Sequence, residues 1–274
     1  YYEGAPLTHE IVMKIVPEQT SRAIAVETAQ ADIADGVSPD DAVRLDALDG
    51  VTVSKTDGNG CHLFQFNCAS DHAPMSIPAV RQAICYAIDR NAICEYLYSG
   101  LGEIPIDSIM APSVAGYSSV GVVPYDPEKA KQLLAEAGYP DGFDLTIMTS
   151  AMYNRAVEMA EIIAEELKEI GINAKLEVVE RAVFTMHSAD TNVNNYGFYN
   201  NAEVDELLEK GAVTMDETER NAIYARIAQI TMYEDPFGAY MNLRKNVYAL
   251  SDKIEGFAVN SSNTMDLAHV RCRE

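Results

Sequence analysis

The sequence predicts an α/β protein in which strands and helices alternate along the chain. Two patterns carry this prediction. Residues 172–178 alternate apolar and polar side chains, as a strand with one buried face does. This run directly follows residues 156–170, where apolar side chains recur every three or four positions, as on one face of a helix. Strands joined by helices in this way form layers of helices packed on a sheet.

The first fifty residues predict four short elements. Residues 11–16 (IVMKIV) are apolar on both faces, which predicts a strand buried on both sides. A helix is expected at residues 23–27 and a short strand at 32–34. Ser38, followed by a proline and two acidic residues, is a typical helix start, because its hydroxyl can cap the helix and the acids suit the positive end of the helix dipole. Gly50 is expected to end that helix.

Two strands separated by a turn are expected next. Residues 51–55 and 61–68 are rich in strand-forming side chains. The segment between them, residues 57–60, has the sequence DGNG, and glycine after Asp or Asn is typical of a turn.

Longer helices are predicted after residue 74. One apolar face recurs at three- and four-residue intervals through Val80, Ala83, Ile84, Ala87 and Ile88. Asp126 before a proline opens a second helix, which Gly138 is expected to end. Asp216 with Glu219 resembles a capping box and predicts a further helix start.

The net charge of the chain restricts the classes of partner that it can bind. Twenty basic side chains stand against 42 acidic ones, a formal net charge of −22 over 274 residues. Such a surface repels phosphates, so we expect no nucleic-acid partner and no direct binding to an anionic membrane. No run of 18 apolar residues is present. The first residue is Tyr1 and not Met, which leads us to expect that the chain is part of a longer gene product.

Catalytic and metal-binding motifs are absent from the sequence. The five histidines are scattered, the five cysteines match no zinc spacing, and no nucleophile elbow, phosphate loop or dinucleotide fingerprint occurs. We therefore expect no enzymatic activity, no metal and no cofactor. Acidic pairs such as Glu165 and Glu166 leave a hydrolase as an alternative, although solvated helix faces explain them better. Tyr153, Tyr196 and Tyr199 are candidates to line a pocket.

Several stretches together resemble the family 5 extracellular solute-binding proteins, the peptide- and nickel-type receptors of ABC importers. The most specific is residues 74–90 (PMSIPAVRQAICYAIDR), which departs from the family pattern at Met75, where phenylalanine is usual. A second is residues 125–139 (YDPEKAKQLLAEAGY). Shorter matches include Asn195-Tyr196, Glu203-Val204-Asp205, Asp235-Pro236-Phe237 and Ile254-Glu255-Gly256-Phe257. Their order and spacing fit the family over nearly the whole chain.

The resemblance implies a two-lobed, periplasmic-binding-protein-like fold of class II, here mostly lobe II with a remnant of lobe I. Residues 1–74 and 246–274 would belong to lobe I and residues 75–245 to lobe II, with hinges near Pro74 and Arg244. Family members are usually much longer, and the resemblance implies that the first part of lobe I and a loop within the short 184–196 connection are not in this chain.

The function implied by the resemblance is transport. The chain would capture di- or oligopeptides outside the cytoplasm, at the cell surface or in the periplasm, and deliver them to the permease subunits of an ABC transporter. The full-length form would be a lipoprotein, held at the membrane only by a lipid anchor outside this chain. The ligand itself stays open, because the resemblance also spans nickel complexes, opines and glycans.

Seven residues are the candidate ligand contacts implied by motif placement. Arg155 is the candidate for the peptide carboxylate, with Tyr153 and Asn154 beside it at a strand-to-helix junction. Asn242 and Arg244 precede the expected lobe crossing, and Gln65 and Asn67 share one face of a strand expected to border the cleft. Arg81 is interpreted as structural, an ion-pair partner on a helix face.

Two function classes compete with the transport receptor. A truncated family member, or an isolated lobe, would have a structural or regulatory role and no tight ligand. The hydrolase alternative rests only on the acidic pairs. Retained binding of peptides or glycosides without turnover would exclude it.

Overall fold

The computed structural model describes residues 5–69, 71, 73–98, 101–151, 155–180 and 197–273, which form two compact units. Unit 1 comprises residues 1–60, 98–103 and 243–274, and unit 2 comprises residues 61–97 and 104–242. Two long strands, β2 (Val51–Gln65) and β6 (Gly238–Ser251), each contribute residues to both units. The α/β class predicted from the sequence is confirmed. The lobe boundaries near Pro74 and Arg244 stay predictions.

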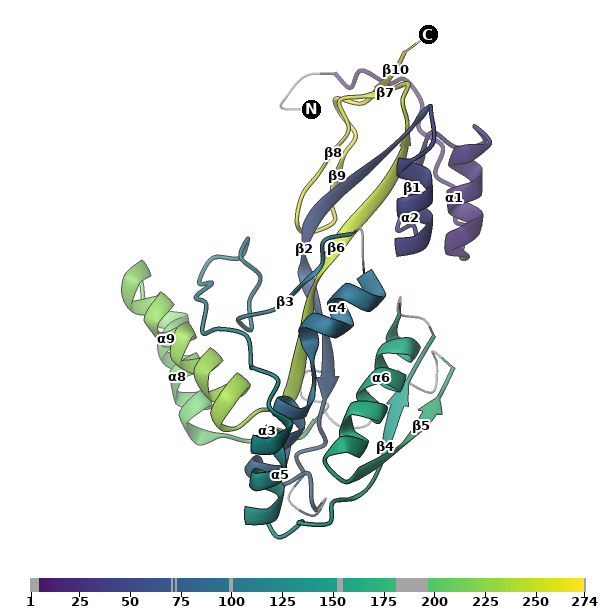
Figure 1. The fold of residues 1–274 in the computed structure, drawn as a ribbon. Coiled ribbons are helices and arrows are strands. Elements are labelled where there is room, and N and C mark those ends of the chain that lie inside the picture. Colours follow the sequence, from purple (N-terminus) through teal and green to yellow (C-terminus); the bar gives the residue numbers. More distant parts are fainter. Residues whose placement is uncertain are drawn as a thin grey trace. The chain divides into compact units, whose positions relative to one another are not determined.

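Unit 1 begins with the predicted helix–strand–helix order. Helix α1 (Gln19–Glu27), strand β1 (Ile33–Asp35) and helix α2 (Pro39–Asp46) follow one another (Figure 1). Strand β1 pairs antiparallel with β6, so that Ala34 lies opposite Ala249, and β6 lies between β1 and β2 in the sheet. Four two-residue strands complete the unit: β7 (Ile254–Glu255), β8 (Ala258–Val259), β9 (Met265–Asp266) and β10 (Arg271–Cys272).

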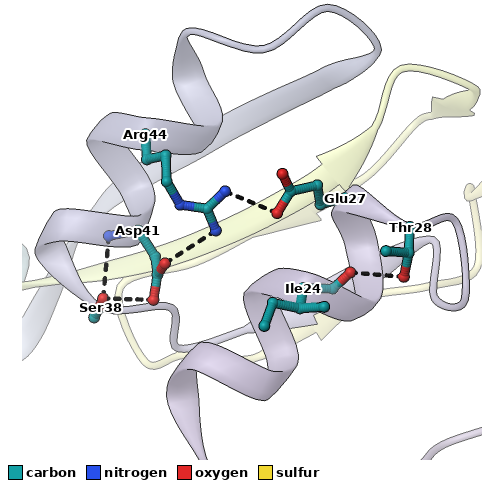
Figure 2. Close-up of polar contacts among 6 residues, drawn as sticks. All are labelled: Ile24, Glu27, Thr28, Ser38, Asp41 and Arg44. Carbon is teal, nitrogen blue, oxygen red and sulfur yellow. Dashed lines mark hydrogen bonds and ion pairs between the residues drawn. The ribbon is translucent and has the colours of Figure 1, made fainter.

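The start of α2 follows the capping rule. Ser38 Oγ accepts a hydrogen bond from the Asp41 backbone N–H at 3.1 Å and donates one to Asp41 Oδ2 at 2.8 Å (Figure 2). Arg44 then joins α2 to α1, because its guanidinium lies 2.7 Å from Glu27 Oε2 and 3.1 Å from Asp41 Oδ1. The helix ends at Asp46, and Gly50 lies in the turn that follows with φ +85°.

The strand predicted at residues 11–16 does not form. Residues 10–18 have no regular secondary structure, and Val12, Met13 and Ile15 are 69%, 74% and 97% exposed. A strand requires a neighbouring strand to pair its backbone N–H and C=O groups. The structure places none beside residues 11–16 within the part of the chain it describes, so the apolar pattern alone gave the wrong prediction here.

The turn predicted at residues 57–60 is also wrong. These residues continue β2 without interruption, and the two glycines are required for close packing and not for a turn. A Cβ on Gly58 would lie 2.9 Å from the backbone oxygen of Arg244, and a Cβ on Gly60 would lie 2.8 Å from the Arg244 guanidinium. Glycine here permits a close approach of β6 to β2. From the sequence alone, glycines with this role cannot be distinguished from the glycines of a turn.

Unit 2 contains the predicted amphipathic helix as α3 (Pro78–Ala87), followed by α4 (Arg90–Tyr98), β3 (Ile104–Pro105) and α5 (Pro127–Glu136). The predicted apolar face of α3 is buried, and α3 packs against α5. Asp126 caps α5 by accepting from Lys129 N at 2.9 Å, and Gly138 ends it with φ +92°, both as predicted.

A strand–helix–strand unit follows in β4 (Phe143–Thr149), α6 (Ala156–Glu169) and β5 (Ile172–Val178). Strands β4 and β5 run parallel, with Phe143 opposite Ile172, and α6 packs against them (Figure 1). This confirms the prediction for residues 156–178. The 184–196 connection lies outside the described residues.

The last helices form an antiparallel pair. Helices α8 (Ala202–Val213) and α9 (Glu217–Gln229) lie side by side (Figure 1) and share a buried cluster of Val204, Ile223, Ile227 and Ile230. Asp216 caps α9 by accepting from Glu219 N at 2.8 Å, as predicted. A π-helical turn (Ile230–Glu234) then leads into β6.

Candidate functional site

Unit 2 contains a cavity of about 1120 Å³, which we call the unit 2 cavity. Three short stretches and the start of α3 line it. The lining residues are Asn67, Cys68, Ala69, Asp71, Ser76, Pro78, Arg81, Phe198, Tyr199, Asn200 and Asp235. They offer amide, hydroxyl and thiol groups, two carboxylates, one guanidinium and two aromatic rings.

A buried ion pair lies at one side of this cavity. Pro78 is the first residue of α3, which places Arg81 in the first turn of the helix. The Arg81 side chain is 4% exposed and forms an ion pair with Asp235 Oδ1, while its Nε donates to Pro236 O at 2.7 Å and its Nη1 to Met75 O at 2.6 Å. The positive charge of Arg81 is therefore compensated inside the protein.

The segment of residues 197–201 forms another wall. At its first residue, the backbone oxygen of Gly197 accepts a hydrogen bond from Cys68 N at a distance of 2.7 Å. Its last residue, Asn201, donates from Nδ2 to Asp235 Oδ2 at 2.8 Å and caps α8 through its Oδ1. A Cβ on Gly197 would lie 2.5 Å from Phe66 O, so only glycine permits this approach. The segment is thus held at both ends.

Burial sets the protonation of two lining groups. It raises the pKa of the Tyr199 phenol, and the neighbouring Asp235 carboxylate adds to the shift. It also raises the pKa of the Cys68 thiol, although Arg81 acts in the opposite direction. Both groups are neutral near pH 7 and keep a hydrogen-bond donor.

One of the predicted contact residues lines the unit 2 cavity, and a second, Gln65, is close to Gly197 in the same unit. Asn67 lines it, with its side-chain oxygen accepting from Ala69 N at 3.1 Å. Gln65 ends β2, and its Nε2 would lie 3.1 Å from a Cβ on Gly197. Both side chains are exposed.

The other predicted contact residues lie elsewhere. Asn242 is fully buried, and its Oδ1 lies 3.1 Å from His62 Nδ1, so it joins β6 to β2. Arg244 is exposed and belongs to unit 1. Arg155 precedes α6 with φ +58° and pairs with Glu158 at 3.0 Å. Tyr153 and Asn154 lie outside the described residues. A role of these residues in ligand binding stays a prediction.

Sequence reasoning missed several residues of the cavity. Arg81 was expected to form an ion pair, and it does so with Asp235, but its place beside a cavity was not expected. Tyr199 was a candidate pocket residue and lines the cavity, whereas Phe198 and Asn200 carried no such signal. The family-like Asp235-Pro236-Phe237 stretch was the available clue.

The described part of the chain contains neither a candidate metal-ligand cluster nor a candidate membrane-spanning helix. It contains no group of three His, Cys, Asp or Glu side chains that could hold a metal ion. No helix in it has both the length and the hydropathy needed to cross a membrane.

Several proteins that are similar to this chain are named as solute-binding proteins. The glutathione-binding protein GsiB of Escherichia coli K12 is 26% identical over 290 residues, which cover 93% of this chain and 56% of that protein. Among solved structures, the binding protein AgaA in complex with agropinic acid, from A. tumefaciens R10, is 26% identical with a TM-score of 0.81, covering 94% of this chain and 60% of AgaA. DppA from Helicobacter pylori in complex with the peptide STSA shares the fold, with a TM-score of 0.81 at 24% identity, covering 94% of this chain and 56% of DppA.

The chain spans about 56% of the length of the curated relatives it matches. Residues 1–209 match the middle-region model of the bacterial extracellular solute-binding proteins, family 5, whose members are binding proteins and not enzymes. Together with the fold, this match confirms the resemblance inferred from residues 74–90 and 125–139. This chain belongs to the family 5 bacterial extracellular solute-binding proteins.

Proposed function

We propose that this chain binds peptides in the unit 2 cavity and serves as the solute-binding component of an ABC importer. The observation that carries the proposal is the cavity itself. Its volume of about 1120 Å³ exceeds the roughly 300–1,000 Å³ of pockets for single small molecules, so it has room for part of an extended peptide.

The chemistry of the lining supports a peptide. A peptide backbone presents alternating N–H donors and C=O acceptors. The Asn67 and Asn200 amides and the Ser76 hydroxyl each donate and accept, so they can satisfy either kind of group. The names of relatives agree, since GsiB binds glutathione, a tripeptide, and the Helicobacter pylori DppA structure contains the peptide STSA.

The finer parts of the proposal follow the family resemblance. Motif placement assigns the peptide carboxylate to Arg155 and further peptide contacts to Asn242, Arg244, Gln65 and Asn67, with Tyr153 and Asn154. Among the described residues of this set, Asn67 lines the unit 2 cavity. Residues 1–74 and 246–274 would form part of lobe I and residues 75–245 lobe II. Delivery would be to membrane permease subunits, with a lipid anchor outside this chain.

Native mass spectrometry and calorimetry test the proposal. The purified chain should carry a peptide adduct that is lost on denaturation, and it should bind Ala-Phe-Ala in isothermal titration. Asn67→Ala should weaken this binding, whereas Asn173→Ala, an exposed amide on β5 bonded to Asp144, should not. Absence of any adduct and of any heat with tripeptides would refute peptide binding.

A separate variant tests Arg155. Removing one partner of a buried charge pair costs about 2–5 kcal/mol, so Arg155→Ala should weaken peptide binding by that amount if Arg155 holds the carboxylate. Glu158→Ala, which removes its partner in the structure, should leave peptide binding intact or strengthen it. Unchanged affinity in Arg155→Ala rules out this role.

One observation favours a second function, that of an isolated lobe without tight binding. The apolar side chains of Ile11, Val12, Met13 and Ile15 are exposed. Tight binding of any tripeptide by the 274-residue chain would exclude this alternative.

A further inference from the structure

Phe198 adopts a backbone conformation that its residue type disfavours. Its φ is +53°, in the left-handed region that L-residues other than glycine rarely adopt. Such strain persists only where the surrounding structure holds it, and it concentrates at ligand-binding sites. Phe198 is also 44% exposed and lines the unit 2 cavity.

The restraint on Phe198 comes from both sides. Gly197 is tied to Cys68 N, and Asn201 is tied to Asp235, which is itself paired with Arg81. The ring is thus presented from a short segment held at its ends, at the wall of a cavity. An aromatic ring fixed in this way loses little conformational entropy when a ligand packs on it.

The charges of the cavity favour one class of ligand group. The guanidinium of Arg81 already faces Asp235 and two carbonyl oxygens. Asp71 adds a second carboxylate to the lining, and the described lining residues include no other basic side chain. A carboxylate entering the cavity would meet like charge, whereas an ammonium or guanidinium group would meet opposite charge and an aromatic face.

We propose that Phe198 is the surface on which one side chain of a bound peptide packs, and that this side chain is apolar, aromatic or cationic but not acidic. The proposal rests on the proposed function and narrows it to a specificity for the peptide side chain in the unit 2 cavity.

Three tripeptides that differ only at the central residue test this specificity by isothermal titration. Ala-Phe-Ala and Ala-Lys-Ala should bind the full chain at least about tenfold more tightly than Ala-Glu-Ala, because like charges in a binding site cost several kcal/mol. Phe198→Gly should weaken the first two by about three- to tenfold, the range for one aromatic or cation–π contact, and should leave Ala-Glu-Ala nearly unchanged.

The choice of variants distinguishes the loss of a contact between the Phe198 ring and the peptide from a loss of protein stability. Phe198→Gly removes the ring and also relieves the positive φ, so its thermal midpoint should not fall below that of the wild type. Phe198→Asn, which tolerates the same conformation, repeats the test if the glycine variant is unstable. Tyr96→Ala is the matched control, since Tyr96 is an aromatic residue 78% exposed on α4 that does not line the cavity, and it should bind all three peptides as the wild type does.

Two outcomes overturn the proposal in distinguishable ways. Equal affinity for the three tripeptides, unaffected by Phe198→Gly and Phe198→Asn, would refute the role of Phe198 while peptide binding stands. No binding of any tripeptide would remove the proposed function and this inference together.

Discussion

Units 1 and 2 use similar apolar patterns with opposite results. In unit 2 the apolar positions of α3 lie in the core, and Val80, Ala83 and Ile84 have no exposed surface. In unit 1 the apolar residues Ile11, Val12, Met13 and Ile15 are exposed, Ile15 to 97%. The difference is that α3 has α5 to pack against, whereas no strand in the described structure pairs with residues 11–16. An apolar pattern shows which side chains would gain stability from burial, but they are buried only where another segment packs against them.

Charged groups show the same contrast. Arg44 in unit 1 pairs with Glu27 and Asp41 with 41% of its side chain exposed. Arg81 in unit 2 pairs with Asp235 with 4% of its side chain exposed. Water screens the first pair and scarcely reaches the second, so their removal should have different consequences.

The largest expected effect is the loss of the buried pair. Arg81→Ala leaves Asp235 without its cation and two carbonyl groups without a donor, and should lower the free energy of unfolding by about 3–5 kcal/mol. Arg44→Ala should cost at most about 1 kcal/mol. Urea unfolding of both variants measures the difference, and equal losses would contradict the contrast between the units.

The next effect tests the close approach of β2 and β6. Gly58→Ala would place a Cβ 2.9 Å from the Arg244 backbone oxygen, which cannot move alone, and should cost about 1–3 kcal/mol. Gly60→Ala meets the end of the flexible Arg244 side chain and should cost less. If these residues formed an exposed turn, both substitutions would be nearly neutral in thermal unfolding.

A smaller effect on stability is expected from Glu166 of α6, and none from its neighbour Glu165. Both oxygens of Glu166 accept from Asp89 N at 3.3 Å, and burial raises the pKa of Glu166 from 4.5 to about 7. Asp89 and Glu169 raise it further, while the Asp89 backbone bond and Arg90 lower it. Because the folded-state pKa is raised, the stability that the protonated form contributes is present below about pH 4.5 and lost as the pH rises through about 7.

The measurement is thermal unfolding between about pH 5 and about pH 8. Relative to Glu166→Gln, which cannot ionise, the wild type should lose stability as the pH rises. Glu165→Gln is the control, because the Glu165 side chain is 72% exposed, and it should follow the wild type at every pH. Parallel curves for the wild type and Glu166→Gln would show that Glu166 is not the titrating group.

The smallest effect is expected in the exposed segment. Ile15→Ser should change the free energy of unfolding by no more than about 0.5 kcal/mol, as exposed positions do. Leu45→Ala in α2 of the same unit, fully buried, should cost about 2–5 kcal/mol. A large loss in Ile15→Ser would mean that the segment is buried in solution.

The candidate site was far less accessible to sequence reasoning than the helices were. Of Gln65 and Asn67, both expected beside a cleft, Asn67 lines the unit 2 cavity, and a role of either residue in ligand binding stays a prediction. The pairing of Arg81 with Asp235 joins residues 154 positions apart, and the segment that carries Phe198 is bonded to Cys68 through Gly197 and to Asp235 through Asn201. No local pattern encodes such contacts.

The sequence by itself determined the family, through residues 74–90 and 125–139, and the helix starts at Ser38, Asp126 and Asp216. Each start depends on a hydrogen bond spanning three residues, which the local sequence contains in full. Only the tertiary structure decided that residues 11–16 are exposed, that β2 continues through residues 57–60, and that Phe198 lines a cavity beside a buried ion pair. These outcomes depend on which distant segments become neighbours, and burial, close approach and charge pairing act only between neighbours in space.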